Sequence, residues 1–194
     1  MPRTQADRTA TTRAALQDAA IEVLVERGWA AVSVVEVCNR AGVSRGAFHH
    51  HYSSLSTLLA DALRRLYDTS LPGGGPPIDD LAGLVDATWT AMNNTKFKAV
   101  LEAWLAMAND PSLREEIGPV VAAFANVVRA DHLSPSILAT EDDRAFYLMA
   151  RETLLGLALG RATSGGKPLG HEATVLTHLR GLAIARHVGG GGGP

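Results

Sequence analysis

The chain contains little cysteine. Its 194 residues include a single one, Cys38, so no disulfide bond can form within the chain. A lone cysteine is typical of proteins from the reducing cytoplasm. The amino-terminal residues MPRTQADRTATTR lack the apolar core of a secretory signal, and no uninterrupted apolar run approaches the ~20 residues that a membrane helix needs. We therefore expect a soluble intracellular protein without a membrane segment.

The chain also lacks the residue spacings that indicate metal or catalytic sites. His49, His50 and His51 are consecutive, and neighbouring side chains on a helix point about 100° apart, so the three cannot all bind one ion. A zinc-binding helix needs two histidines four residues apart. The glycines at 73–75 precede no Lys-Ser or Lys-Thr pair, and Ser164 lies in no G-x-S-x-G element. We predict no metal site, no cofactor and no enzymatic activity.

Positive charge is scarce overall but unevenly distributed. The formal net charge is -2, so the whole protein is not a polycation. Residues 1–67 nevertheless carry eight arginines, no lysine and six acidic residues, whereas the remainder carries ten basic and fourteen acidic residues. The amino-terminal third is therefore the better candidate for contact with a polyanion.

Helical periodicity is the main pattern that the chain does contain. Hydrophobic residues make up 46% of the chain and charged residues 20%, an ordinary balance for a globular protein. Apolar residues recur every three or four positions in the segments 16–24, 97–108, 120–128 and 175–183, and the segment 144–160 is apolar almost all round. No two-residue alternation is long enough to indicate a sheet. We therefore predict an all-α fold.

Glycine- and proline-rich stretches interrupt this helical pattern. They are LPGGGPP at 71–77, SGGKPLG at 164–170 and GGGGGP at the end of the chain. Such stretches break helices, and the first of them indicates a linker. The chain is long enough for two small domains on either side of that linker.

The segment 28–59 carries the most specific pattern. Ser33 can cap a helix that Gly42 would end with a tight turn, and Ser44 can cap a second short helix at 45–51. The inward face of the first helix would be formed by Val34, Val37, Cys38 and Ala41. Two short helices joined by a glycine-containing turn are typical of a helix-turn-helix motif. In that motif the second helix enters the major groove of DNA.

The segment 26–63 resembles the DNA-binding domain of the TetR/AcrR family of bacterial transcriptional repressors. The resemblance is carried by Gly28-Trp29, a cap at Ser33, Ala-Gly-Val-Ser at 41–44, and a small–apolar–aromatic–x–His–aromatic pattern at 47–52. It implies a three-helix DNA-binding domain at 9–69 that ends in a connecting helix, roughly 54–69. It further implies a helical effector-binding and dimerisation domain at 78–188. The glycine-rich composition of residues 189–194 predicts a flexible tail after that domain.

The resemblance also implies which residues contact DNA. They are Ser33, Ser44, Arg45, Gly46, Ala47, His49 and His50. Arg45 is the best candidate for reading a base, since its guanidinium matches the O6 and N7 acceptors of guanine. Ala47 could contact a thymine methyl group, Ser33 would bind a phosphate, and His49 and His50 would reach backbone phosphates.

Two positions depart from the family pattern. His49 stands where the family usually has a phosphate-contacting tyrosine, so the contact would become pH-dependent. Leu55 stands where the family usually has a lysine that meets the DNA backbone, which predicts the loss of one phosphate contact. Two other residues of the motif are expected to have structural roles. His51 is expected to pack beside Tyr52, and Cys38 is expected to fill a core position.

Candidate ligand-binding side chains lie in the remaining two thirds of the chain. They are Trp89, Met92, Phe97, Trp104, Met107, Phe124 and Tyr147, although each taken singly is more typical of an ordinary core residue. Glu102 and Arg151 could anchor a ligand or be solvated charges.

The resemblance implies a dimer in which the last two helices, about 141–164 and 171–188, form a four-helix bundle with their symmetry mates. The predicted interface residues are Leu148, Leu155, Gly156, Leu157, Gly160, Val175, Leu179, Leu182 and Arg186. Gly156 and Gly160 are spaced for close approach of another helix.

Together these observations predict a cytoplasmic bacterial transcriptional regulator. It would bind a palindromic double-stranded operator as a homodimer and leave it when a small-molecule effector binds. Two alternatives stay open. One is a helical small-molecule-binding protein of the same fold that has lost DNA binding, and the other is a metal-dependent hydrolase that uses the histidines.

Overall fold

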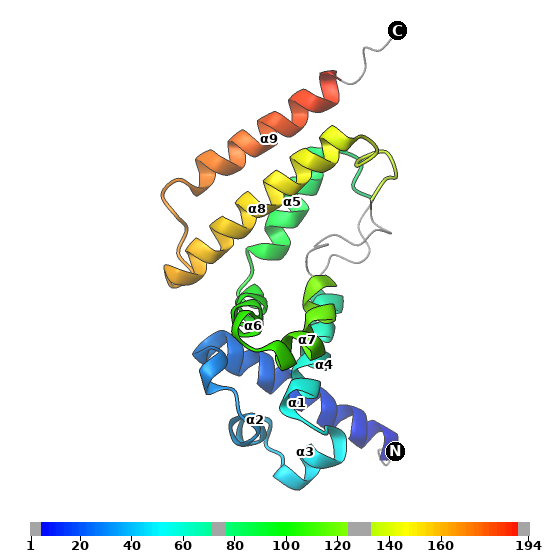
Figure 1. Ribbon diagram of the computed structural model, residues 1–194, viewed down its shortest axis with the longest axis vertical. Coiled ribbons are helices and arrows are strands. Elements are labelled where there is room, and N and C mark those ends of the chain that lie inside the picture. Colours follow the sequence, from blue (N-terminus) through cyan, green and yellow to red (C-terminus); the bar gives the residue numbers. More distant parts are fainter. Residues whose placement is uncertain (1–4, 71–76, 124–132, 190–194) are drawn as a thin grey trace. The chain divides into compact units, whose positions relative to one another are not determined.

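The computed structural model describes residues 5–70, 77–123 and 133–189, and it confirms the all-α prediction over these ranges (Figure 1). No strand forms within them, and Ile78 and Leu133 make only an isolated bridge. Phe124, predicted to line a ligand pocket, and residues 190–194 of the predicted tail lie outside the described residues.

The chain folds into two compact units. One is formed by residues 1–69 and 98–125, and the other by residues 70–97 and 126–194. The predicted domain at 78–188 is therefore not one compact body, because its residues 98–125 pack with the amino-terminal unit. The division of the chain by function stays a prediction.

The first unit contains the predicted helix-turn-helix. Its elements are α1 (Gln5–Arg27), a 3-10 turn η1 (Trp29–Ala31), α2 (Val34–Ala41), α3 (Arg45–His51), α4 (Leu55–Ser70), nearly all of α6 (Phe97–Asn109), and α7 (Pro111–Ala123). The apolar stripe predicted in α1 is buried throughout. With Phe48 of α3 and Leu58 and Leu63 of α4, which are fully buried, it forms the core that holds the motif.

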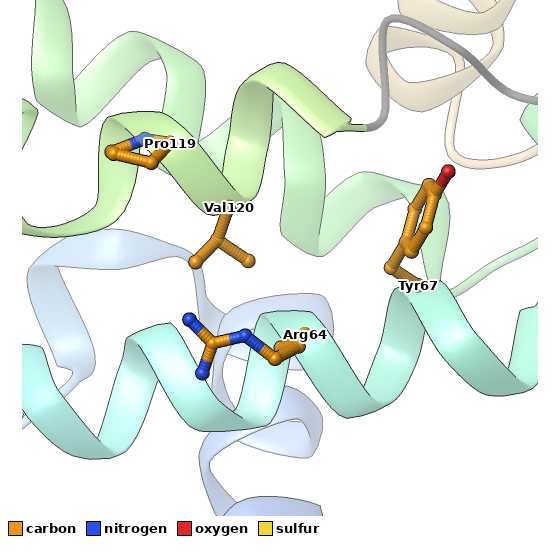
Figure 2. Close-up of a pocket in the computed structure, with 4 residues that line it drawn as sticks. All are labelled: Arg64, Tyr67, Pro119 and Val120. Carbon is orange, nitrogen blue, oxygen red and sulfur yellow. The ribbon is translucent and has the colours of Figure 1, made fainter.

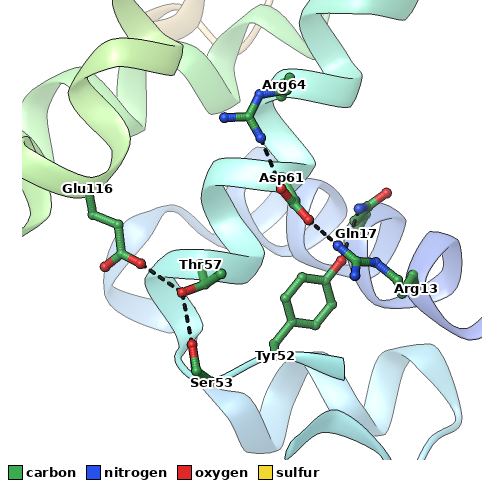
Figure 3. A network of polar contacts seen from close by, with 8 residues as sticks. All are labelled: Arg13, Gln17, Tyr52, Ser53, Thr57, Asp61, Arg64 and Glu116. Carbon is green, nitrogen blue, oxygen red and sulfur yellow. Dashed lines mark hydrogen bonds and ion pairs between the residues drawn. The ribbon is translucent and has the colours of Figure 1, made fainter. Parts of the chain in front are cut away.

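Polar contacts tie α1 to α4 and to the end of α3 (Figure 3). Asp61 of α4 accepts hydrogen bonds from Arg13 of α1 and from Arg64, the latter at 3.0 Å. Gln17 of α1 donates to the buried Tyr52 hydroxyl at 2.9 Å, and the Arg13 guanidinium lies 4.9 Å from the centre of the Tyr52 ring. Tyr52 directly follows α3, so these contacts fix where that helix ends.

Glu102 of α6 has a structural role in the first unit. Its Oε2 accepts the backbone N–H of Trp29 at 2.9 Å, and its carboxylate lies beside Gly28, whose φ of 77° ends α1. On the same helix, Lys98 Nζ donates to the carbonyl oxygen of Val25 at 2.6 Å. Glu102 is therefore not simply a solvated charge, because it holds the turn after α1 in place. A role for it as a ligand anchor stays a prediction.

The second unit consists of α5 (Leu81–Met92), α8 (Glu141–Thr163) and α9 (Glu172–Gly189), and α5 packs against both of the others. The last two helices agree with the predicted ranges to within one residue. At the turn between them, Arg161 and Glu172 form a largely buried ion pair at 2.8 Å. Arg180 of α9 binds Asp86 of α5 at 2.6 Å.

We expect Gly42→Ala to lower the free energy of unfolding by about 1–2 kcal/mol, because Gly42 has a left-handed backbone with φ 67° and ψ 31°. No atom lies within 4 Å of the added Cβ, so the loss would report backbone strain alone. Gly46→Ala is the matched control: it lies in α3, its Cβ meets only Ser44 Oγ at 3.8 Å, and alanine favours a helix. Urea unfolding of the wild type and both variants measures these free energies. A Gly42→Ala variant as stable as the wild type would contradict the prediction.

Candidate nucleic-acid interface

Both helices of the motif begin as the sequence predicts. Ser33 Oγ accepts the backbone N–H of Glu36 at 3.2 Å, and Ser44 Oγ accepts that of Ala47 at 3.1 Å. Each serine thus caps its own helix with its oxygen lone pairs. The hydroxyl proton of each serine remains available for an external acceptor such as a phosphate.

Helix α3 presents its polar side to solvent. Arg45, Gly46, His49 and His50 are exposed and Ala47 is half-buried. Phe48, on the opposite side, is fully buried and anchors the helix. The predicted DNA-contacting residues of α3 therefore share an accessible face, and their contacts with DNA stay predictions.

Arg45 differs from the other arginines near the motif. Arg40 binds Glu26 at 2.6 Å and Glu22 at 3.7 Å, and Arg27 binds Glu36 at 2.8 Å. The Arg45 guanidinium forms no ion pair within the described ranges. Its charge is therefore not neutralised by the protein and is available to an external anion or acceptor.

The three consecutive histidines separate in the structure. His49 packs edge-on against Phe48 with ring centres 5.2 Å apart, and His50 meets His51 in a similar way at 5.1 Å. His51 is half-buried, and burial, followed by the charges of His50 and Arg13, lowers its pKa. Its packing beside Tyr52 stays a prediction. In the part of the chain that the structure describes, no group of three or more His, Cys, Asp or Glu side chains is placed to hold a metal ion.

Cys38 is buried in the core, as the sequence predicts, and this burial raises the pKa of its thiol. It lies on α2, near the turn that leads to α3, and its Sγ lies 3.9 Å from the carbonyl oxygen of Ser44. This position indicates packing between the two motif helices.

Leu55 packs against the protein, whereas the lysine expected at this position would extend into solvent. It is half-buried and lines a hollow of about 260 Å³ between the start of α4 and the start of α7, where Trp29, Leu59 and Leu113 also lie. Across the same hollow, the carboxylate of Glu116 accepts hydrogen bonds from the hydroxyl groups of α4. The sequence has no signal for Glu116, because it is about sixty residues away and belongs to no motif.

A second hollow of about 160 Å³ lies farther along the same two helices (Figure 2). It is lined by Arg64 and Tyr67 of α4 and by Pro119 and Val120 of α7. Hollows therefore lie at two places between α4 and α7.

The predicted ligand-binding residues are divided between the two units. Trp104 and Met107 belong to the first unit, whereas Trp89, Met92, Phe97 and Tyr147 belong to the second. Trp89, Met92 and Phe97 are buried there. The Tyr147 hydroxyl lies 3.3 Å from Thr88 Oγ1, and burial raises its pKa. A shared pocket for this set stays a prediction.

The predicted dimer residues occupy different environments in α8 and α9. Leu148 and Leu182 are each 48% exposed, and Gly156 is open to solvent. Leu157 and Leu179 are buried within the chain itself, at 5% and 6% exposure. The others are the half-buried Leu155, Gly160 and Val175 and the exposed Arg186. A Cβ on Gly160 would meet Leu169 of the same chain at 2.6 Å, so its small size already serves an internal contact.

The capped pair α2–α3, with its buried anchor and accessible polar face, defines a helix-turn-helix protein. Residues 16–62 match the family described as "Bacterial regulatory proteins, tetR family". Over 167 residues, the chain is 34% identical to the HTH-type transcriptional regulator CymR of Pseudomonas putida, covering 81% of this chain and 82% of CymR. The chain therefore belongs to the TetR family and is a DNA-binding transcriptional regulator.

Solved structures show the same fold. A transcriptional regulator from Rhodococcus sp. Rha1 superimposes with a TM-score of 0.61 at 24% identity, covering 89% of this chain and 96% of the other. FadR of Bacillus subtilis, solved in complex with stearoyl-CoA, has a TM-score of 0.56 at 16% identity, covering 86% and 96%. None of the described helices of this chain is long and apolar enough to cross a membrane.

Proposed function

We propose that the protein is a cytoplasmic transcriptional repressor that binds a palindromic operator as a homodimer and is released by a small-molecule effector. Residues 9–69 would bind DNA, and residues 78–188 would supply the effector site and the dimer interface. The observation that carries the proposal is α3, which is anchored by the buried Phe48 and presents on its accessible face Arg45, which forms no ion pair with the residues that the structure describes.

The side chains of α3 suit different parts of a DNA groove. Arg45 is the first residue of the helix, the end from which a recognition helix contacts bases. His49 and His50 lie one turn later and can donate hydrogen bonds to phosphates. Gly46 and Ala47 add little bulk, so the backbone between these contacts can approach the groove closely.

Arg45→Ala should weaken operator binding by about 1–3 kcal/mol and relax the sequence preference at one position of each half-site, because a bidentate contact to guanine would be lost. Selection from a random DNA library, followed by fluorescence anisotropy on the selected operator, measures both effects. Arg40→Ala is the control: it removes the same charge from a side chain that Glu26 and Glu22 already hold. An unchanged preference in the Arg45 variant would refute its role.

Operator affinity should rise several-fold as the pH falls from 8 to 6 at constant salt, because histidine side chains gain charge in this range and attract phosphates. His49 and His50 would carry this effect. His51 would not, since its lowered pKa keeps it neutral over more of the range. The measurement is a binding titration at several pH values. Replacing His49 and His50 by glutamine should flatten the dependence, and a double variant that keeps the wild-type slope would contradict the assignment.

The dimer would be formed by the exposed apolar side of α8 and α9. Leu148, Leu159 and Leu182 are large apolar side chains that lie substantially exposed on these helices. Such exposure on neighbouring elements marks an interaction surface. The open Gly156 would let another helix approach closely. A second copy of the chain is the proposed occupant, because a palindromic operator requires two heads related by a twofold axis.

Leu148→Glu combined with Leu182→Glu should convert the dimer to monomer, because both leucines are exposed and a buried charge opposes association. Sedimentation velocity gives the mass of each species. Leu157 and Leu179 are unsuitable, since a charge there would disrupt the core of the protomer. Leu105→Glu, at an exposed leucine of α6, is the matched control and should remain dimeric. A dimeric double variant would place the interface elsewhere.

Release of the operator on effector binding would follow from a shift in the populations of two conformations. A ligand that binds more tightly to a form with wrongly spaced heads lowers operator affinity by that difference in binding free energy. FadR, which shares the fold, holds stearoyl-CoA in its structure, and this supports a ligand site in the helical body. The predicted lining residues, among them Trp89, Trp104 and Tyr147, are the first positions to probe.

A further inference from the structure

The first turn of α4 is crowded with hydroxyl groups and holds one carboxylate. Ser54 Oγ accepts the backbone N–H of Thr57 at 3.0 Å and lies 2.8 Å from Thr57 Oγ1 and 3.0 Å from Ser56 Oγ. Thr57 Oγ1 donates to Glu116 Oε1 at 2.7 Å, and Ser56 donates to the other carboxylate oxygen of Glu116. Figure 3 shows Thr57 between Ser53 and Glu116. Two hydroxyl groups of α4 thus bind one carboxylate of α7.

This turn has the chemistry of an anion site. The first residues of a helix have backbone N–H groups without helical partners and the positive end of the helix dipole, and both favour negative charge. The serine and threonine hydroxyls add donors of the kind that bind phosphates. The hydroxyl groups of Ser56 and Thr57 lower the pKa of Glu116, so the bound group is an ionised carboxylate. The protein therefore fills the site with its own anion.

The same turn lies close to the proposed DNA-binding surface. Tyr52, Ser53 and Ser54 are the only residues between the end of α3 and the start of α4. So short a connection spans at most about 14 Å. His49 and His50, the proposed phosphate contacts, are in the last turn of α3. A phosphate bound near them would have a neighbouring phosphate within reach of this turn.

Among the residues that the structure describes, no cation pairs with the carboxylate at this turn. Leu55, the first residue of α4, faces the hollow with Trp29 and Leu113. Glu116 forms no ion pair within the described ranges, and its contacts there are to hydroxyl groups. Any phosphate that approached the turn would therefore meet an unneutralised negative charge, which disfavours its binding.

We propose that Glu116 is an autoinhibitory group: its carboxylate occupies the first turn of α4 in place of an operator phosphate, so full DNA engagement requires α7 to withdraw it. This inference rests on the proposed function and adds a regulatory contact to it. The position of α7 on α4 would set operator affinity, and anything that moves α7 would change it.

The packing of α7 against α4 allows such a movement. Hollows of about 260 Å³ and 160 Å³ lie along the contact, on different stretches of α4. Pro119, inside α7 at the second hollow, removes one helical hydrogen bond and so weakens the helix there. Leu113, Ile117, Val120 and Val121 of α7 are buried, so the shift that withdraws Glu116 has to be small enough to keep them in the core.

The test compares Glu116→Gln with Glu115→Gln in the full-length protein. Both variants remove one negative charge from an exposed side chain of α7, but of the two only Glu116 accepts hydrogen bonds from α4 within the described residues. Glu116→Gln should bind the selected operator at least about fivefold more tightly than wild type, since a like charge about 4 Å from a phosphate costs roughly a factor of five even in water. The slope of log affinity against log salt should steepen by up to about 0.9 per subunit. Glu115→Gln should match wild type in both measurements.

Equal or weaker binding by Glu116→Gln, at the salt slope of Glu115→Gln, would overturn the inference and leave the proposed function intact. Failure of the wild-type protein to select any operator would instead overturn the proposed function, and this inference with it. Carbon-13 NMR of the Glu116 carboxyl group in wild-type protein gives a readout that needs no variant to fold. Its pKa should rise toward the ordinary glutamate value when operator is added, and an unchanged value would contradict displacement.

Discussion

The burial of Phe48 and Tyr52 against α1 and α4 is the interaction on which the DNA-binding surface depends. Helix α3 has only seven residues, too few to be stable alone, so its direction comes from this packing. Phe48 fixes the helix from beneath, while Gln17 and Arg13 hold Tyr52 at its end. With its inward side fixed, the helix exposes Arg45, whose side chain has no ion-pair partner among the described residues.

The distribution of ion pairs separates the structural arginines from the one proposed to read DNA. Arg13 and Arg40 form ion pairs with carboxylates of the same unit, so their charges are neutralised within the protein. The amino-terminal third is therefore less basic toward a partner than its eight arginines suggest. With Leu55 turned inward and Glu116 on the first turn of α4, operator binding would depend on few charges, histidines among them.

Much of the helix-turn-helix could be predicted because its signals are local. Ser33 and Ser44 cap helices within three residues of themselves, and Gly42 needs only its own backbone conformation. The partner of Glu116 could not be predicted, since it depends on how α7 lies on α4. Glu102 was missed for the same reason: no short-range pattern indicates that it holds the backbone of Trp29. Leu157 and Leu179 have the spacing of interface residues, but packing within the chain buries them.

By itself, the sequence determined the helical fold, the bounds of α2 and α3, and the family resemblance, because helix periodicity, capping and turn conformation act over a few residues. Only the tertiary structure decided which arginines of the described residues form ion pairs and which do not, which apolar residues of α8 and α9 stay exposed, and which anion occupies the start of α4. Those properties arise between segments tens of residues apart, where packing brings together groups that no local pattern relates.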